Sequence, residues 1–264
     1  MTDKPLSYGR KSISASTSPK ELMTNSPRLS NVWTADVITL YPNLFPGVLG
    51  ESIVGKSLEK NKWALETVNL RDFGIGAHKK VDDTPAGGGA GLVLRADVIE
   101  PALEKSILSS GKERPLVYMS PRGKRFDQTL AKKWAAAPGV IILCGRFEGI
   151  DERILERYDI DEISLGDFVM TGGEIAAQAM IDATVRLLPN VLGNPDSPLD
   201  ESHSNGLLEY PQYTKPAEWK GQKIPETLLS GHHENIAKWR MDQAKTKTKK
   251  HRPDLWKAWN KTKN

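Results

Sequence analysis

Two glycine-rich turns carry residue types that could hold a ligand and act on it. The first, CGRFEGIDER, spans residues 144–153, and the second, SLGDFVMTGGE, spans residues 164–174. Glycines let the backbone approach a ligand closely, while Arg146, Glu148 and Phe168 place charged and apolar side chains among them. An apolar side chain between glycines suits a flat aromatic ligand such as adenine. We therefore predict one ligand pocket here, the alternative being two tight chain reversals.

Each of these turns must be positioned by the elements on either side of it. Apolar runs at 140–143 and 160–165 precede the two turns, and residues 174–187 have the periodicity of a buried helix. In open α/β sheets, ligands bind at loops that leave the carboxyl ends of strands and open into helices. Strands that alternate with helices also favour a parallel sheet, so we predict an α/β fold.

The other expected elements alternate in the same way. Strands are expected at 33–40, 63–70 and 115–119, and helices at 45–60, 96–109 and 126–135. The sequence SPRG at 120–123 is expected to form a turn. Residues 72–92 are expected to form a long polar loop that contains a run of glycines. No Gly-Lys-Ser/Thr follows this run, so it is not a P-loop, and a flexible surface loop is the simpler interpretation.

The composition is that of an ordinary globular protein, with 38% hydrophobic and 27% charged residues. No apolar run approaches the roughly 20 residues that a membrane-spanning helix needs, so no membrane association is expected. The only cysteine is Cys144, which excludes an internal disulfide and suits a reducing compartment. With five histidines and one cysteine, a catalytic zinc site is not expected either. We expect a cytoplasmic protein.

The positive charge is concentrated towards the end of the chain. The net charge is +4, and residues 238–264 contain ten Lys or Arg against two Asp, with Trp239, Trp256 and Trp259 among them. Basic residues interleaved with aromatic ones favour a surface that contacts phosphates, although a merely solvated face is the alternative. The first 31 residues are rich in Ser, Thr, Pro and Lys without hydrophobic periodicity, so a disordered extension is expected.

Several motifs together resemble one enzyme family. Besides the two glycine-rich turns, they are DDTPAGGGAG at 82–91, YMSPRG at 118–123, GLLEYPQYTKP at 206–216 and LLSGHH at 228–233. In combination they closely resemble the bacterial tRNA (guanine-N1-)-methyltransferase (TrmD) family, which acts at guanosine 37 of tRNA. The resemblance covers about residues 32–264 and is specific as a set, although each motif alone is weak.

This resemblance implies the SPOUT architecture, in which a parallel α/β sheet ends in a C-terminal trefoil knot and the protein forms a homodimer. The implied domains are an N-terminal extension at 1–31, a knotted donor-binding domain at 32–193, a linker at 194–206 and a small, basic, helical domain at 207–264. The last of these would contact the anticodon arm of tRNA, and DNA is not an implied partner.

The implied methyl donor is S-adenosylmethionine, held by the loops of the knot. The residues that match the family's donor-binding loops lie in three segments: Tyr118, Met119, Ser120 and Pro121; Gly145, Phe147, Glu148 and Gly149; and Leu165, Gly166, Asp167, Phe168, Val169, Met170, Gly172 and Gly173. Phe147 and Phe168 stand where many relatives carry Tyr, a change that keeps the ring and loses a hydroxyl. An acid matching Glu148 lies near the donor in this family, and a requirement for Mg²⁺ is left open.

Methyl transfer to guanine N1 needs a general base that removes the N1 proton and a hydrogen-bond donor that stabilises the negative charge developing on O6. By resemblance, Arg186 is that hydrogen-bond donor. The general base falls on Glu201, with the adjacent Asp200 as the alternative. Asp82 and His203, together with Arg186, are the implied substrate-binding residues. Two other functions stay open: a knotted RNA methyltransferase for another base, which the 206–216 motif disfavours, and a non-catalytic RNA-binding module.

Overall fold

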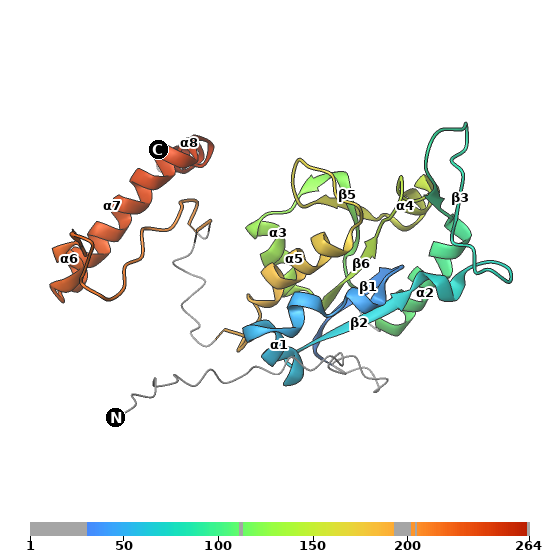
Figure 1. The fold of residues 1–264 in the computed structure, drawn as a ribbon, viewed down its shortest axis with the longest axis horizontal. Coiled ribbons are helices and arrows are strands. Elements are labelled where there is room, and N and C mark those ends of the chain that lie inside the picture. Colours follow the sequence, from blue (N-terminus) through green and yellow to red (C-terminus); the bar gives the residue numbers. More distant parts are fainter. Residues whose placement is uncertain (1–30, 111–112, 193–201, 204, 263–264) are drawn as a thin grey trace, which may run out of the picture.

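The computed structural model describes residues 31–110, 113–192, 202–203 and 205–262. Within them, five parallel strands form the central sheet in the order β2-β1-β6-β5-β7 (Figure 1). The strands are β1 Trp33–Thr39, β2 Trp63–Asn69, β5 Leu116–Arg125, β6 Gly139–Cys144 and β7 Asp161–Ser164. The predicted parallel α/β sheet is thus confirmed. Because every strand runs in the same direction, all the carboxyl ends meet at one edge.

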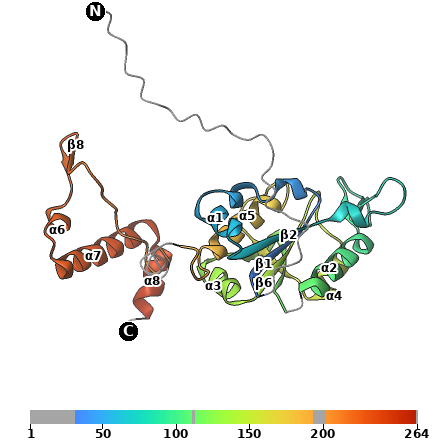
Figure 2. The same cartoon turned by 90° about the horizontal axis from the view of Figure 1, so that it is seen from below.

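Helices cover both faces of the sheet and bury an apolar layer on each (Figures 1 and 2). On one face lie α1 Ser52–Glu59, α3 Gln128–Ala136 and α5 Glu174–Val185. On the other lie α2 Ala96–Ser110 and α4 Glu152–Tyr158. Successive side chains of β6 alternate between the two layers, as the pleat of a strand requires. This explains why β6 reads as an uninterrupted apolar run.

The helix predicted at 45–60 is shorter than expected. The chain instead makes two 3-10 turns, Pro42–Leu44 and Gly47–Gly50, before α1 begins at Ser52. Gly47 adopts a φ of +55°, and the preceding Pro46 has no backbone N–H to donate, so a continuous right-handed helix is interrupted there. The amphipathic pattern was correct for α1 only.

The turn predicted at 120–123 was also wrong, because these residues lie inside β5. The register of β5 against β7 shifts between Met119 and Lys124, so that residues 120–123 bulge out and the strand then pairs again. At Gly123, an added Cβ would lie 2.3 Å from the backbone of Glu162. Only glycine allows β5 and β7 to approach so closely, which is a tertiary contact that the local sequence does not reveal.

A shorter antiparallel pair closes the long loop after β2. Its strands are β3 Asp82–Asp83 and β4 Val93–Leu94, with Asp82 opposite Leu94. Leu94 also bridges to Ile150, in the loop after β6. The loop that contains the glycine run is therefore anchored beside the first glycine-rich turn.

The C-terminal residues form a small, mainly helical unit, drawn in orange and red in Figure 1. It contains α6 Glu226–Leu229, α7 His233–His251 and α8 Pro253–Lys261, with a hairpin of β8 Glu218–Trp219 and β9 Gln222–Lys223. The Leu208 N–H donates to Thr248 Oγ1 on α7 at 2.8 Å, which docks the start of this unit on its longest helix. The rings of Trp256 and Trp259 stack at 5.4 Å.

The implied domain bounds and the trefoil knot stay predictions. The predicted extension, except for Asn31, and most of the predicted linker lie outside the described residues. Among the helices that are described, none has both the length and the apolar character needed to span a membrane.

Candidate active site

The loops that follow β5, β6 and β7 enclose a pocket at the carboxyl edge of the sheet. The pocket has a cavity volume of about 220 Å³ and opens to solvent. Its walls come from residues 118–121, 145–149, 163–165 and 168–173, and the first turn of α5 closes it with Ala176. The two glycine-rich turns thus form one pocket, as their sequence predicted.

Nearly all the predicted donor-binding residues line this pocket, the exceptions being Gly166 and Asp167. The Gly166 carbonyl accepts a hydrogen bond from Ser164 Oγ at 2.9 Å, which stabilises the turn that follows β7. The Asp167 side chain is largely exposed and pairs with Arg125 at 2.8 Å. Arg146, Ile163, Ser164, Thr171 and Ala176 also line the pocket and were not among the predicted donor-binding residues. Their only signal in the sequence is their position within or beside the two glycine-rich turns.

The ring of Tyr118 forms a buried wall of the pocket. A Cβ added at Gly145 would lie 2.6 Å from the Tyr118 hydroxyl oxygen, and one at Gly149 would lie 3.1 Å from it. The tyrosine therefore leaves no room for a side chain at Gly145 and little at Gly149, where the φ of +123° also favours glycine. Burial raises the pKa of Tyr118 to about 12, so this wall is a neutral phenol at physiological pH.

Two phenylalanines that line the pocket keep about half of their surface exposed. Phe147 is 47% exposed and Phe168 is 55% exposed. Phe147 has a φ of +59°, which is uncommon for a bulky residue, and the turn around it is closed by the Gly149 N–H donating to the Arg146 carbonyl at 3.1 Å. Exposed rings of this kind offer stacking surfaces for a flat aromatic ligand.

Glu148 connects the pocket to the glycine run. Its N–H donates to the Leu92 carbonyl at 3.0 Å, and a Cβ added at Gly91 would lie 2.5 Å from Glu148 Cγ. Gly87 and Gly88, by contrast, have no neighbouring atom within 4 Å of an added Cβ. The end of the glycine run therefore packs on the site, whereas its beginning agrees with the surface-loop interpretation.

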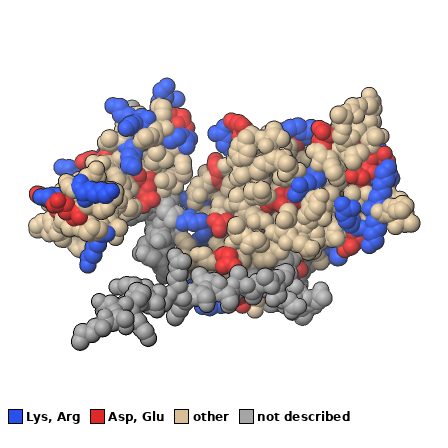
Figure 3. Space-filling model, viewed as in Figure 1, with Lys and Arg blue, Asp and Glu red and all other residues tan. Residues whose placement is uncertain are grey.

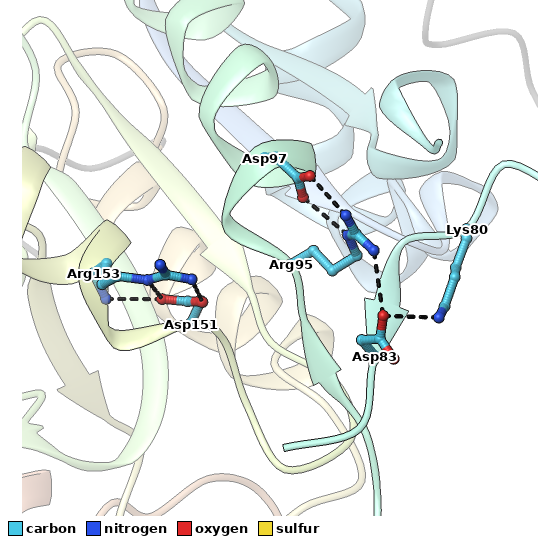
Figure 4. Close-up of polar contacts among 6 residues, drawn as sticks. All are labelled: Lys80, Asp83, Arg95, Asp97, Asp151 and Arg153. Atoms are coloured by element: carbon cyan, nitrogen blue, oxygen red, sulfur yellow. Dashed lines mark hydrogen bonds and ion pairs between the residues drawn. The ribbon is translucent and has the colours of Figure 1, made fainter. Parts of the chain in front are cut away.

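A second, larger cleft lies beside the glycine run, and its charges are paired with one another (Figure 4). Arg95 donates two hydrogen bonds to Asp97 and a third to Asp83, and Lys80 approaches Asp83 at 2.8 Å. The hydrogen bond from Lys80 is the main reason that the pKa of Asp83 is lowered. Because these charges compensate each other, the cleft presents no excess positive charge to an anionic ligand.

Arg186, the one implied catalytic residue that the structure describes, does not line this pocket. Arg186 follows α5 and lies ten residues beyond Ala176, which corresponds to about 15 Å along the helix axis at 1.5 Å per residue. His203 is exposed, and its backbone N–H donates to the Leu207 carbonyl at 2.9 Å. Glu201 and Asp200 lie outside the described residues. Asp82 lies on β3, in the segment that Leu94 anchors beside the pocket loop.

A magnesium ion would need a cluster of oxygen ligands. Among the described residues, no group of three or more His, Cys, Asp or Glu side chains is placed to hold a metal ion. The described part of the pocket therefore offers no built cation site.

Comparison with known proteins identifies the family to which the chain belongs. A family model described as tRNA (Guanine-1)-methyltransferase TrmD matches residues 33–258. The chain belongs to this family. Relatives named tRNA (guanine-N(1)-)-methyltransferase include one from Ruegeria sp. (strain TM1040), 60% identical over 90% of this chain and 97% of the relative. Another, from Ruegeria pomeroyi, is 59% identical over 92% of this chain and 100% of the relative.

A more distant TrmD relative, from Gluconobacter oxydans, is 54% identical over 86% of this chain and 96% of its own length. The TrmD match covers the sheet, the pocket loops and the C-terminal helices together. The resemblance found from the motifs is thereby confirmed.

The neutral state of Tyr118 can be tested by spectrophotometric titration. We expect the difference between the wild-type protein and Tyr118→Phe to show no tyrosinate from this residue near pH 10, because burial disfavours the phenolate. The stabilisation due to the neutral phenol is complete below the pKa of the unfolded chain, about 10, and is lost as pH rises towards 12. A difference titration with its midpoint near pH 10 would contradict the buried wall.

Proposed function

We propose that this protein transfers a methyl group from S-adenosylmethionine to N1 of guanosine 37 in the anticodon loop of tRNA. The observation that carries the proposal is the coincidence of the pocket with the residues that match the family's donor-binding loops. The chain's membership of the TrmD family and the names of its relatives support a tRNA (guanine-N1) methyltransferase.

In this proposal the pocket holds the donor, and S-adenosylmethionine supplies an electrophilic methyl group when bound. The adenine ring lies among Phe147, Phe168 and the glycine backbone, where the pocket offers apolar surface and close approach. The neutral Tyr118 phenol adds no charge to this wall.

The acceptor chemistry requires groups from the second half of the chain. The linker carboxylate, Glu201 or its neighbour Asp200, takes the N1 proton so that the nitrogen lone pair can attack the methyl carbon. Arg186 donates to guanine O6, where negative charge develops as the proton leaves. Asp82 and His203 contact the guanine.

The active site is completed by a second copy of the chain. Arg186 lies about 15 Å along the helix axis beyond the nearest pocket residue of its own helix, so the Arg186 that serves this pocket comes from the partner subunit. Apolar side chains are available to form the interface, since Val48, Ile53 and Ile175 are 69%, 47% and 66% exposed. They lie on neighbouring elements, because Gln178 of α5 donates to the Leu44 carbonyl at 2.9 Å.

The proposal includes the trefoil knot and the RNA-binding role of residues 207–264. The Phe126 N–H donates to the Ser164 carbonyl at 2.8 Å, so the end of β5 lies beside the second glycine-rich loop, which the resemblance assigns to the knot. Lys and Arg side chains are spread over the visible face of the C-terminal helices (Figure 3). They would contact phosphates and position the RNA, while the pocket selects the base.

A methyl-transfer assay tests the proposal directly. We expect transfer to tRNA that carries G37 and none to the same tRNA with A37, because adenine presents an N6 amino donor where guanine presents the O6 acceptor that Arg186 would contact. The measurement is incorporation of a labelled methyl group, with the modified position identified by mass spectrometry. Absence of transfer to the G37 substrate, with a family relative active in parallel, would refute the proposed activity.

The identity of the base can be tested by neutral, isosteric substitutions. We expect Glu201→Gln to lower turnover by about two orders of magnitude or more, the usual contribution of a general base, while donor binding stays unchanged. Asp200→Asn is the matched control and should retain most of the activity. If Asp200→Asn lowers turnover in this way and Glu201→Gln retains most of the activity, the base is Asp200.

Mixing two inactive variants shows whether the two groups of one active site come from the same chain. Arg186→Ala and Glu201→Gln chains should each be inactive, because each lacks one essential group. The outcome of mixing depends on which chain supplies Arg186 and which chain supplies the carboxylate of one site. In a mixed dimer, activity recovers if the two groups come from different chains. Activity stays absent if one chain supplies both groups, because each site then lacks one of them. Sedimentation must first show that the chains exchange.

Recovery cannot occur in a protein that works as a monomer. A wild-type chain that sediments as a monomer while it is fully active would therefore refute the proposal that a second copy completes the active site.

A further inference from the structure

The guanidinium of Arg146 connects three segments that meet at the pocket. Its Nη2 lies 2.8 Å from Glu174 Oε2, and its Nε donates to Oε1 of the same carboxylate at 3.2 Å. Nη1 donates to the Thr171 carbonyl at 3.3 Å, and the guanidinium lies 4.4 Å from the centre of the Tyr41 ring. The end of β1, the loop after β6 and the loop before α5 are therefore joined by one side chain.

The second glycine-rich loop is built around this side chain. A Cβ added at Gly172 would lie 2.3 Å from Arg146 Nε, so the guanidinium occupies the place that any larger residue would need. Arg146 and Gly172 also form an antiparallel bridge, and the Gly173 N–H donates to the Gly145 carbonyl at 3.1 Å. Side chain and backbone together hold the two pocket walls at a fixed separation.

The Glu174 carboxylate is itself held by a further hydrogen bond. Glu174 is 1% exposed, and its Oε1 accepts a hydrogen bond from Thr39 Oγ1 at 2.7 Å. Thr39 Oγ1 in turn accepts from the Tyr41 N–H at 2.9 Å, which fixes the residue whose ring contacts the guanidinium. The end of β1, which lines no part of the pocket, therefore supports it indirectly.

An ion pair as buried as this one is a poor way to gain stability alone. Removing two charges from water costs free energy that their attraction often only balances, and apolar replacements are frequently as stable. What Arg offers is geometry, because its planar fork can bind a carboxylate, a carbonyl and an aromatic face at once. Lys carries the same charge on a single nitrogen and cannot replace all three contacts.

We propose that Arg146 is a positioning residue for the methyl donor. It holds the wall formed by Thr171, Gly172 and Gly173 against the wall that begins at Gly145, and thereby sets the width of the pocket. The inference rests on the proposed function, since it takes the ligand of this pocket to be S-adenosylmethionine. It assigns a role to the Arg146–Glu174–Thr39 network that neither the chemistry at guanine nor the backbone turns require.

The first test measures the affinity for S-adenosylhomocysteine by calorimetry. Arg146→Lys keeps the charge opposite Glu174, and we expect affinity to fall about tenfold because the support of the pocket wall is loosened. Arg157→Lys is the matched control. Arg157 also pairs with a glutamate, Glu100, at 2.8 Å and lies 5.9 Å from a tyrosine ring, but it is 69% exposed and lines no part of this pocket. The control should bind like the wild-type protein.

A second test separates positioning from stability. Arg146→Met alone leaves the Glu174 carboxylate buried without its cation, so we expect a lower melting temperature. Adding Glu174→Gln removes that charge and should recover the melting temperature, while affinity for S-adenosylhomocysteine stays low. If affinity recovers together with the melting temperature, Arg146 has only a structural role and the inference is overturned.

The failure of this inference can be told from failure of the proposed function. Wild-type protein that does not bind S-adenosylhomocysteine argues against the proposed donor. Wild-type protein that binds it, with Arg146→Lys binding equally well, overturns the positioning role and leaves the donor assignment intact.

Discussion

The contact between the two glycine-rich loops is the constraint on which the pocket depends. At Gly173 the chain passes so close to β5 and β6 that an added Cβ would lie 2.8 Å from Met119 Cβ and 3.1 Å from Cys144 Cα. No side chain fits there, and the Gly173 N–H instead bonds the Gly145 carbonyl. This single approach brings the start of α5 against the end of β6. The walls of the pocket, the burial of Tyr118 and the reach of Arg146 to Glu174 all follow from it.

The fold around this contact could largely be predicted from the sequence. Apolar runs that precede glycine-rich turns identify buried parallel strands, and parallel strands place their following loops at one edge. What could not be predicted is which side chain each glycine makes room for. Gly145 gives space to Tyr118 and Gly172 to Arg146, and these pairs lie 27 and 26 residues apart in the chain. The errors at 45–60 and 120–123 differ in origin. Pro46 and the positive φ of Gly47 interrupt the first helix locally, whereas residues 120–123 are drawn into β5 by pairing with the distant β7.

The residues implied for the chemistry at guanine show a different limit. A resemblance assigns roles to Arg186, Glu201 and His203 position by position, but it does not say in which chain they act. The length of α5 separates Arg186 from the pocket of its own chain by about 15 Å. That separation is a property of helix geometry and was available from the expected helix at 174–187. The separation bears on which chain supplies Arg186 only once the pocket is known to lie at the other end of the helix.

The charges around the pocket suit the ligand that we propose for it. The positive charge of Arg146 is compensated by the buried Glu174, and Tyr118 stays neutral because burial raises its pKa. Glu148 is then the one carboxylate on the pocket wall, among the described residues, whose charge is not matched by Arg146. A pocket with this balance favours a cationic ligand over an anionic one. S-adenosylmethionine carries a sulfonium charge that disappears when its methyl group is transferred. The same pocket would therefore hold the donor more strongly than the spent product, and the loss of that attraction would assist product release.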